Sequence, residues 1–398
     1  MRTILLLAAS CLAPACHHPL DAPAPPTPGL TSAWVAFDPE RVRASGASGL
    51  ADRASGRVAT IEDPVRIASV SKLVVALGVM RLVEEGRLDL DTDVSRWLGW
   101  QLRNPAYPDV PITLRRLLSH TSSLQDEGDN YVIPLGRTVR EMIARPATFD
   151  AAHRPGSYFR YANINFPVIA SVMEKAAGER FDRLIDGKVL KPLGLDACFN
   201  YTTCSDAKLA RIVVLYRPNG TVARDDLRGR RPDCPVATEG PGCDLGSYQL
   251  GSNGALFSPQ GGLRASMSDL ARIGQLILNR GRIGGRAFLR PESVDAVLGP
   301  VWEFDGNNGD TSDGFYCAYG LASQQLPAGG PGCRDDLTGT GRKLVGHAGE
   351  AYNLRSGLWI DFQRRVGIAY FAANTDAGTG RSAYHTVEEQ LVARLPAR

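Results

Sequence analysis

Apolar residues recur at three- and four-residue steps in the stretch that follows Ser69. Leu73, Leu77 and Met80 lie on one stripe of the helix that this spacing predicts. Gly86 follows the last apolar position, where a C-terminal helix cap is expected. Ser69 therefore lies at or near the start of a helix that ends close to residue 86.

The same periodicity appears in several later segments. It predicts helices at residues 113–118, 138–144, 166–177, 181–189, 268–278, 291–297 and 384–395, with Thr113 and Ser268 as N-caps. Strands are expected at residues 32–37, 356–360 and 366–373, with a hairpin turn at 361–365 and a further hairpin within 45–60. Residues 198–246 show little periodicity and are expected to form long surface loops.

Strands near both ends and helices in the middle indicate an α/β (α+β) fold with a helical insertion. With 398 residues the chain can form one large domain or two lobes. We expect a single domain over residues 31–398, with an α/β lobe at 31–68 plus 255–398 and a helical lobe at 69–254. A crevice between two such lobes is a usual place for a site.

The N-terminal residues have the pattern of an export signal. Arg2 precedes a short apolar run, and small residues lead to Ala15 and Cys16. This pattern predicts a signal peptide over residues 1–15, followed by a Pro-rich tether at 16–30. A cysteine directly after small residues resembles a bacterial lipoprotein signal, so Cys16 is a candidate for lipidation and membrane attachment; ordinary cleavage after Ala15 is the alternative.

Six further cysteines form three close pairs along the chain. Nearest-neighbour pairing, one of 15 possible connectivities, gives the disulfides Cys198–Cys204, Cys234–Cys243 and Cys317–Cys333. Metal binding is the alternative, but no Cys-x-x-Cys or histidine cluster supports it. Disulfides agree with an exported, periplasmic or membrane-anchored protein.

The composition excludes several classes of function. Apolar residues make up 43% of the chain and charged residues 22%, which is ordinary for a globular protein. A net charge of +3, with no basic block that carries interleaved aromatics, gives no reason to expect nucleic acid binding. No motif calls for a metal or an organic cofactor, and after the signal region no second apolar stretch could span a membrane.

Ser69 and Lys72 lie three residues apart at the start of the first predicted helix, so they share a face. A serine hydroxyl beside a lysine amine is a candidate nucleophile and base. The alternative is an N-cap serine with a solvated lysine. A second such pair, Ser205 and Lys208, opens no comparable apolar helix, and we interpret it as chance.

Other motifs occur in a fixed order around this pair. They are Tyr161-x-Asn163 and His347-Ala348-Gly349, with Leu117-Leu118-Ser119-His120-Thr121-Ser122 and Gly261-Gly262-Leu263 as flanks. From Val65 to Asn374 the chain resembles the serine β-lactamase and penicillin-binding hydrolase superfamily. Its Tyr-x-Asn element is similar to that of class C β-lactamases, D-alanyl-D-alanine carboxypeptidases, D-aminopeptidases and related esterases. The resemblance implies a β-lactamase/transpeptidase-like fold, with an antiparallel sheet flanked by helices.

The resemblance also implies a role for each motif residue. Ser69 would be acylated, and Lys72 would ease removal of its proton. Tyr161 would act as a base or proton relay, helped by a nearby cation because a free tyrosine has a pKa of ~10. Asn163 would hold the amide of the substrate, and His347 would stand on a strand beside the cleft, where many relatives have lysine.

The backbone N–H groups of Ser69 and Glu350 would form an oxyanion hole beside Gly349. Donors of this kind typically contribute ~3 kcal/mol each. Arg355 could meet a substrate carboxylate or point to solvent.

The remaining motif side chains have structural alternatives. Tyr161 could be a core aromatic residue, and His347 a structural histidine. The resemblance makes His120 a structural hydrogen-bonding residue, and His153 and His385 receive no role.

Two departures from the class C pattern bear on the substrate. His347-Ala348-Gly349 replaces Lys-Thr-Gly, and a histidine is only partly cationic at neutral pH. Glu350 adds a negative charge beside this motif. The histidine and the missing threonine hydroxyl argue against efficient β-lactam hydrolysis, and Glu350 argues against a carboxylate-terminated substrate.

The expected function is that of an exported serine hydrolase acting through an acyl-enzyme. D-amino-acid peptides or amides, including peptidoglycan-derived ones, or β-lactam-like amides are the expected substrates, in the manner of a D-alanyl-D-alanine carboxypeptidase. A small-molecule carboxylesterase of the same fold and a non-catalytic envelope binding protein are the alternatives.

Overall fold

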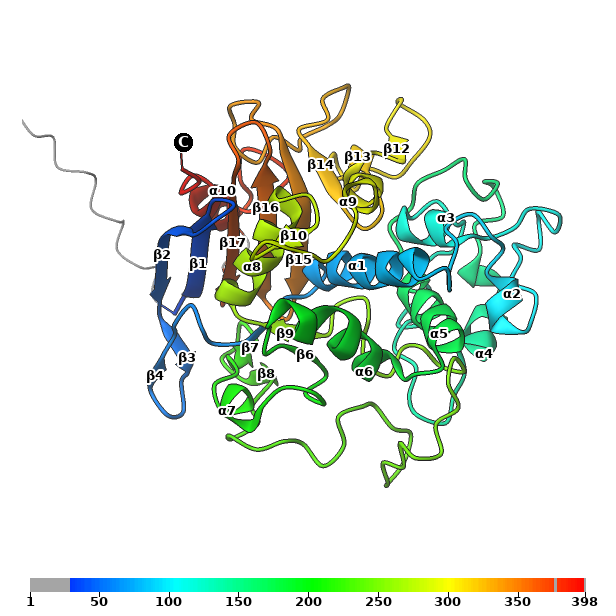
Figure 1. The fold of residues 1–398 in the computed structure, drawn as a ribbon, viewed down its shortest axis with the longest axis horizontal. Coiled ribbons are helices and arrows are strands. Elements are labelled where there is room, and N and C mark those ends of the chain that lie inside the picture. The colour runs from blue at the N-terminus through cyan, green and yellow to red at the C-terminus, as the bar shows by residue number, and fades with distance from the viewer. Residues whose placement is uncertain (1–28, 376–377, 397–398) are drawn as a thin grey trace, which may run out of the picture.

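The computed structural model describes residues 29–375 and 378–396, and its centre is an eight-stranded sheet. Every neighbouring pair of strands is antiparallel. The strands follow the order β12 (Trp302–Glu303), β13 (Ala318–Tyr319), β14 (Gln324–Leu326), β15 (Leu344–Ala351), β16 (Leu354–Asp361), β17 (Val366–Ala373), β1 (Thr31–Phe37) and β2 (Val42–Ser48). Figure 1 shows β1 between β2 and β17, so strands from early and late parts of the described chain share one sheet.

Helices cover both faces of this sheet. Helix α8 (Met267–Leu278) packs with Phe37 and Phe371 on one face, whereas α10 (Thr386–Val392) packs with Trp359 and Tyr370 on the other. The central strands β16 and β17 are buried along nearly their whole length. Because successive strand residues point to opposite faces, this burial means that both faces of the sheet are covered. The fold is mixed α/β with a large antiparallel sheet, as predicted.

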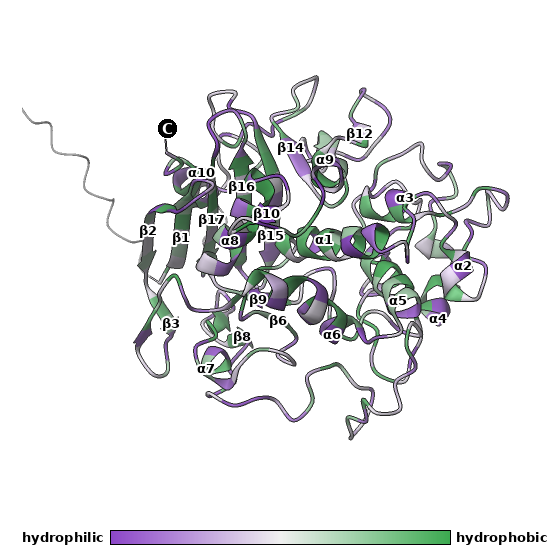
Figure 2. Cartoon of the chain, in the orientation of Figure 1, coloured by the Kyte–Doolittle hydropathy of each residue, from purple (hydrophilic) through white to green (hydrophobic). Residues whose placement is uncertain are grey.

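Helix α1 (Val70–Glu84) lies between the sheet and the helical part of the chain (Figure 1). It contacts β15 and β16 on one side and α5 (Asn165–Ala177) on the other. Twelve of its fifteen residues are buried. Figure 2 shows the apolar character of this helix and of the central strands. The prediction of one apolar stripe was therefore too narrow, because α1 is packed on nearly every side.

The helical part consists of short helices around α5. They are α2 (Ser95–Leu98), α3 (Leu114–Leu118), α4 (Val139–Ile143) and α6 (Phe181–Ile185). The predicted helix at 181–189 continues past α6 as one π turn, Asp186–Leu190, and a 3₁₀ turn, Lys191–Leu193. Thr113 caps α3 as expected, through its side chain and the backbone N–H of Arg116.

Small sheets connect these parts. One joins β5 (Val65–Arg66), β9 (Leu263–Ala265) and β6 (Cys198–Phe199). The others pair β3 (Leu50–Asp52) with β4 (Arg57–Val58), β7 (Leu215–Tyr216) with β8 (Val222–Arg224), and β10 (Arg282–Ile283) with β11 (Arg286–Ala287). Helices α7 (Asp206–Leu209) and α9 (Pro291–Leu298) and a 3₁₀ turn, Pro146–Thr148, complete the chain.

Three predicted boundaries were wrong. Ser266, not Ser268, caps α8, because β9 ends at Ala265 and the Ser266 hydroxyl forms a capping box with Asp269. The expected hairpin at 45–60 is divided, since β2 pairs with β1 and only β3 and β4 pair with each other. Helix α10 begins at Thr386 and ends at Val392, so it is shorter than predicted.

The structure contains the three disulfides that nearest-neighbour pairing predicts, Cys198–Cys204, Cys234–Cys243 and Cys317–Cys333. Over residues 29–375 and 378–396, no helix has the length and apolar character needed to cross a bilayer. The predicted signal peptide, Cys16 and most of the tether lie outside the described residues. The division into two lobes stays a prediction.

Candidate active site

Ser69 lies in a turn between β5 and α1 that other strands hold in place. The backbone N–H of Ile67 donates to the carbonyl of Leu263 at 3.0 Å, and the Ser356 hydroxyl donates to the carbonyl of Ile67 at 2.8 Å. Ala68 has a positive φ of 45°, a conformation that L residues adopt only at a cost. The fold therefore fixes Ser69 at the N-terminal end of α1.

Lys72 lies one turn further on and is fully buried. Its Nζ is 3.0 Å from Ser69 Oγ, 2.9 Å from Asn163 Oδ1 and 2.6 Å from the carbonyl oxygen of Gln260. Burial lowers the pKa of Lys72 to about 7, although the negative charge of Asp126 acts in the opposite direction. A substantial fraction of Lys72 is therefore uncharged at neutral pH.

The three partners of Lys72 suit a neutral amine. Asn163 Oδ1 and the Gln260 carbonyl can only accept, so they take the two N–H bonds that an uncharged amine retains. The third neighbour, the Ser69 hydroxyl, can donate. The lone pair of the neutral amine therefore faces the hydroxyl proton of Ser69.

Tyr161 lies in the loop before α5, between two aromatic rings. It stacks on His120 at a centroid distance of 4.3 Å and on Tyr316 at 4.8 Å, and Lys72 Nζ is 5.0 Å from its ring centre. Burial raises the pKa of Tyr161, although the neighbouring hydroxyls of Ser69 and Tyr316 favour ionisation. Neither forms a well-aligned hydrogen bond with the Tyr161 hydroxyl within the described residues. The phenol therefore keeps its proton at neutral pH.

Asn163 has both ends of its side-chain amide engaged within the protein. Its Oδ1 accepts from Lys72, and its Nδ2 donates to Asp126 Oδ2 at 3.0 Å. Since Lys72 directs an N–H bond at Asn163 and a carboxylate can only accept, these partners fix the orientation of the amide. The contacts differ from the expectation that Asn163 holds the substrate; here Asn163 contacts the lysine.

His347 does not meet the expectation of a partly cationic histidine at the cleft. It lies on β15 but is 1% exposed, and burial, together with the charge of Lys72, lowers its pKa to about 3. Its Nδ1 faces the carbonyl of Ala348, which can only accept, so Nδ1 carries the proton. Nε2 then accepts from the Tyr319 hydroxyl at 2.8 Å. His347 is therefore neutral, and these two contacts fix the orientation of its ring.

The end of β15 lies directly beside Ser69. A Cβ on Gly349 would be 2.6 Å from the Ile67 carbonyl oxygen and 3.1 Å from Ser69 N, so only glycine fits. The N–H of Ala348 points toward β14, where it donates to Gln324 Oε1 at 2.9 Å. N–H directions alternate along a strand, so the N–H of Glu350 points the same way, away from β16. The pairing of β15 with β14 ends at Gly346. Glu350 therefore lies beyond the last residue of β15 that pairs with β14.

A cleft of about 500 Å³ opens at Ser69. Its lining comes from the catalytic candidates, an aromatic segment, the end of β15 and the start of α10: Ser69, Tyr161, Asn163, Ser312, Phe315, Tyr316, Ala348, Gly349, Glu350, Arg355, Ala383, His385 and Glu388. The cleft thus collects residues that are far apart in the sequence.

The charged groups Arg355, Glu350 and Glu388 in this lining all have partners within the protein. Arg355 Nη1 forms an ion pair with Glu350 Oε2. Glu388 is buried and accepts from the Tyr370 hydroxyl and the N–H of His385, each at 3.1 Å. Burial raises the pKa of Glu388 to about 7. Arg355 therefore meets a carboxylate of the protein itself.

Two further histidines, His120 and His153, have structural contacts. His120 Nδ1 accepts from the N–H of Ala162 at 3.0 Å and faces Asn165 Nδ2 at 3.1 Å. Burial lowers the pKa of His120 well below its ordinary value. His153 pairs with Asp150 at 2.8 Å, away from the cleft lining.

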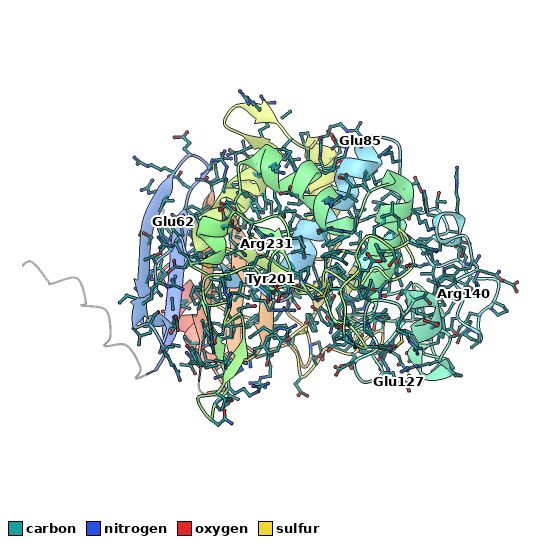
Figure 3. The ribbon with its side chains drawn as sticks, turned by 90° about the horizontal axis from the view of Figure 1, so that it is seen from below. Glu62, Glu85, Glu127, Arg140, Tyr201 and Arg231 are labelled. Carbon is teal, nitrogen blue, oxygen red and sulfur yellow. A yellow bond between two sulfur atoms is a disulfide. The ribbon has the colours of Figure 1, made fainter. Side chains whose placement is uncertain are left out.

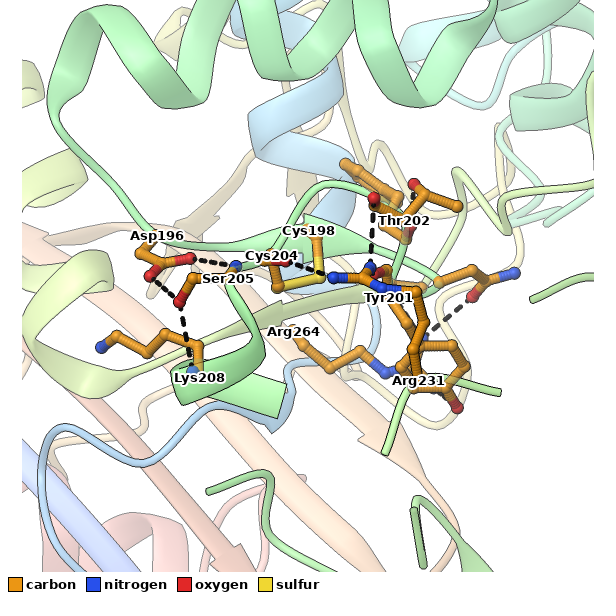
Figure 4. The surroundings of a disulfide bond; sticks show 12 residues. Asp196, Cys198, Tyr201, Thr202, Cys204, Ser205, Lys208, Arg231 and Arg264 are labelled. Atoms are coloured by element: carbon orange, nitrogen blue, oxygen red, sulfur yellow. Dashed lines mark hydrogen bonds between the residues drawn. A yellow bond between two sulfur atoms is a disulfide. The ribbon is translucent and has the colours of Figure 1, made fainter. Parts of the chain in front are cut away.

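The second Ser-x-x-Lys pair lies elsewhere, beside the disulfide Cys198–Cys204 (Figure 4). Ser205 is the N-cap of α7, and its hydroxyl accepts from the backbone N–H of Lys208 at 3.2 Å. The ammonium of Lys208 donates to the carbonyl of Glu62. This pair is a helix cap, because the lysine side chain points away from the serine.

Sequence reasoning missed three residues around Ser69. Gln260 contributes only its backbone carbonyl, which no side-chain pattern reveals. Asp126 reaches Asn163 across 37 positions of sequence. Tyr316 covers Tyr161 from a loop fixed by the disulfide Cys317–Cys333. Of the three, only Asp126 could have been noticed in the sequence, because its carboxylate follows the Ser119–Ser122 motif within a few residues.

A family model described as Beta-lactamase matches residues 28–393, so this chain belongs to the beta-lactamase family of serine hydrolases. Esterase EstB of Burkholderia gladioli is 34% identical over 170 residues, which are 38% of this chain and 42% of EstB. D-alanyl-D-alanine-carboxypeptidase/endopeptidase AmpH of Escherichia coli (strain K12) is 29% identical over 166 residues, 39% of this chain and 41% of AmpH. The chain thus matches less than half the length of either relative.

Solved structures share the fold over almost the whole chain. A penicillin-binding protein homologue from Pyrococcus abyssi has a TM-score of 0.65 and 21% identity, over 92% of this chain and 72% of its own. The D-amino acid amidase from Ochrobactrum anthropi SV3, solved with D-phenylalanine, has a TM-score of 0.62 and 19% identity, over 92% of both chains. At such identities the comparison establishes the fold alone.

Proposed function

We propose that this protein is a serine hydrolase that forms an acyl-enzyme on Ser69 and acts on small esters or amides without a free carboxylate beside the scissile bond. The observation that carries the proposal is the environment of Lys72, which pairs a pKa of about 7 with contacts to Ser69 Oγ, Asn163 Oδ1 and the Gln260 carbonyl. A base of this pKa works well near neutral pH.

The first step is attack by Ser69. Neutral Lys72 takes the hydroxyl proton, and Ser69 Oγ forms a bond to the substrate carbonyl carbon. The carbonyl oxygen becomes an oxyanion, for which the N–H groups of Ser69 and Glu350 are the proposed donors. Such donors act without reorganisation because the backbone already holds them.

Tyr161 is the proposed acid for the leaving group. Its phenol keeps its proton, since burial raises its pKa, and it faces the cleft beside Ser69. When the tetrahedral intermediate collapses, the bond to the leaving group breaks and the phenol proton goes to the leaving oxygen or nitrogen. The proton held on Lys72 then restores Tyr161, and the acyl group remains on Ser69.

Water completes the cycle. Lys72 takes a proton from a water molecule that attacks the acyl carbonyl, and it returns that proton to Ser69 Oγ as the bond between Oγ and the acyl carbon breaks. The products are a carboxylic acid and the free enzyme. No cofactor enters either half of the reaction.

The charges of the cleft support an uncharged substrate. Arg355 is neutralised by Glu350, His347 is neutral, and Glu388 adds a further carboxyl group. A substrate carboxylate would therefore have to displace Glu350 from Arg355. The local similarity to esterase EstB agrees with this preference.

D-alanyl-D-alanine carboxypeptidase activity is the second candidate, and the similarity to AmpH favours it. Initial rates on p-nitrophenyl butyrate, a D-amino acid amide and a D-Ala-D-Ala peptide distinguish the candidates, with Ser69→Ala as the control for each. The first candidate predicts Ser69-dependent turnover of the ester or amide well above that of the peptide. Faster Ser69-dependent turnover of the peptide would reverse the order, and no turnover of any substrate would contradict both.

We also propose that the protein is exported and that lipidation of Cys16 anchors it to the membrane. The three disulfides support an oxidising compartment. Fractionation of cells that produce the wild type and Cys16→Ala tests this. Membrane association lost in Cys16→Ala supports the anchor, soluble export of both forms contradicts the anchor alone, and cytoplasmic retention contradicts export.

A further inference from the structure

A carboxylate outside the predicted motif set holds the partner of Lys72 in place. Asp126 lies in the loop after α3, and its two oxygens accept three N–H groups from the two residues that directly precede α5. The backbone N–H and the side-chain Nδ2 of Asn163 both donate to Oδ2 at 3.0 Å, and the N–H of Ile164 donates to Oδ1 at 3.0 Å. Two oxygens with three donors leave this carboxylate one orientation.

The consequence of these bonds reaches the catalytic candidates through Asn163. With Nδ2 held by Asp126, the side-chain amide of Asn163 must turn Oδ1 toward Lys72, which donates to it at 2.9 Å. Without Asp126, both ends of that amide could exchange places, and an N–H would then face the N–H bonds of Lys72. The chain Asp126–Asn163–Lys72 therefore fixes where the lone pair of Lys72 points.

We infer that Asp126 is a positioning residue of the proposed reaction, which aims Lys72 at Ser69 through Asn163. Its negative charge also acts on Lys72, where it favours the ammonium form. The inference rests on the proposed function. It adds a carboxylate from the loop after α3 to a site otherwise built from α1, the start of α5, β15 and the turn before β9.

Two effects follow from removal of the charge, and they can be measured separately. The loss of an anion disfavours the ammonium form, so the pKa of Lys72 should fall. The freed amide of Asn163 should also misplace Lys72, and a displacement of about 1 Å at such a site can cost ~10²-fold in rate. Substitution of a residue that only supports the fold would not shift the pH dependence of kcat/KM. It would also not cause a loss of activity confined to the plateau of kcat/KM.

Asp126→Asn keeps the size of the side chain and removes its charge and one acceptor. The pH profile of kcat/KM on p-nitrophenyl butyrate should show an acid limb at lower pH and a plateau reduced by ~10²-fold. Glu127→Gln is the matched control, because Glu127 is the next residue, carries the same charge and is exposed at the edge of the molecule (Figure 3). It should retain the wild-type profile. An unchanged profile in Asp126→Asn, or an equal change in Glu127→Gln, would overturn the inference.

The pKa of Lys72 gives a second readout that needs no turnover. NMR titration of ¹³C-lysine-labelled protein, with the Lys72 signal assigned by its loss in Lys72→Met, should give a lower pKa in Asp126→Asn than in the wild type. The same pKa in both proteins overturns the inference. A lower pKa in a protein that hydrolyses no substrate supports it while the proposed function fails. If Asp126→Asn does not fold, Asp126→Glu is the second variant, because it keeps the charge and lengthens the side chain. It should retain the acid limb of the wild-type pH profile and lose activity on the plateau. A shifted acid limb in Asp126→Glu would contradict the role of the charge.

Discussion

Lys72 Nζ lies 3.0 Å from Ser69 Oγ, and burial lowers the pKa of that lysine to about 7. The lysine would be cationic at neutral pH in water, where it could not accept the serine proton. Its buried position, with two carbonyl acceptors beside it, instead provides a neutral amine at the pH at which the site would work.

The first prediction concerns the pH dependence of kcat/KM. Below a pH of about 7 Lys72 is an ammonium and cannot take the Ser69 proton, so kcat/KM should rise with pH through an acid limb centred near this value. Lys72→Arg keeps a cation that does not titrate in this range and should lose most of the activity. A wild-type rate that is constant from pH 5 to pH 8 would contradict the role of Lys72 as the base.

The second prediction separates the roles of Tyr161 and Lys72. Tyr161→Phe removes the proposed acid and leaves the ring stacking with His120 and Tyr316 intact. General acid catalysis contributes typically 10²–10⁴-fold, so hydrolysis of alkyl esters and amides should fall by about that much. Esters of p-nitrophenol should lose far less, because that leaving group departs without a proton. Equal losses for both kinds of substrate would indicate that Tyr161 acts as the base instead.

The third prediction concerns stability and Glu388, whose pKa is raised from 4.5 to about 7 by burial. The folded state binds the proton of this carboxyl more tightly than the unfolded state. Its contribution is therefore complete below pH 4.5 and is lost as the pH rises through about 7, a change of about 3 kcal/mol in the free energy of unfolding. Glu388→Gln resembles the protonated form and should escape this loss.

Urea unfolding of the wild type and Glu388→Gln between pH 4.5 and 8 checks this prediction. The free energy of unfolding of the variant, relative to the wild type, should increase with pH. Glu389→Gln is the control, because the pKa of Glu389 is lowered and its variant should show no such increase. A difference between Glu388→Gln and the wild type that does not depend on pH would show that Glu388 ionises normally in the folded protein.

The fourth prediction concerns the disulfide Cys317–Cys333. Tyr316, which stacks on Tyr161 and lines the cleft, is the neighbour of Cys317. Replacing both cysteines with serine should lower kcat/KM as well as stability. The reason is that the loop that places Tyr316 against Tyr161 loses its disulfide cross-link. The double serine variant of Cys234 and Cys243, whose disulfide lies outside the cleft lining, should lower stability alone. Equal kcat/KM values for the two variants would show that the Cys317–Cys333 bond does not support the site.

The sequence predicted the local features of the site well. The spacing of Ser69 and Lys72 and the apolar run after them identified α1, because both depend on residues close together in the chain. The capping residue of α8 was misplaced by two positions, although Ser266 and Asp269 have the spacing of a capping box. The error arose because the end of β9 was not predicted.

Features that depend on burial and long-range contacts could not be predicted. The neutrality of His347 follows from its enclosure beside Tyr319, 28 positions earlier in the sequence. The Gln260 carbonyl reaches Lys72 across 188 positions. Neither contact leaves a periodic or compositional signal, so the charge state of the cleft and the pKa of Lys72 required the folded structure.

The most direct test of the central claim is the intact mass of the protein after brief exposure to p-nitrophenyl butyrate and quenching in acid. The account predicts one butyryl adduct on the wild type, located by peptide mapping to Ser69, and none on Ser69→Ala. An adduct of equal yield on Ser69→Ala, or a wild-type adduct located at another residue, would contradict acylation of Ser69.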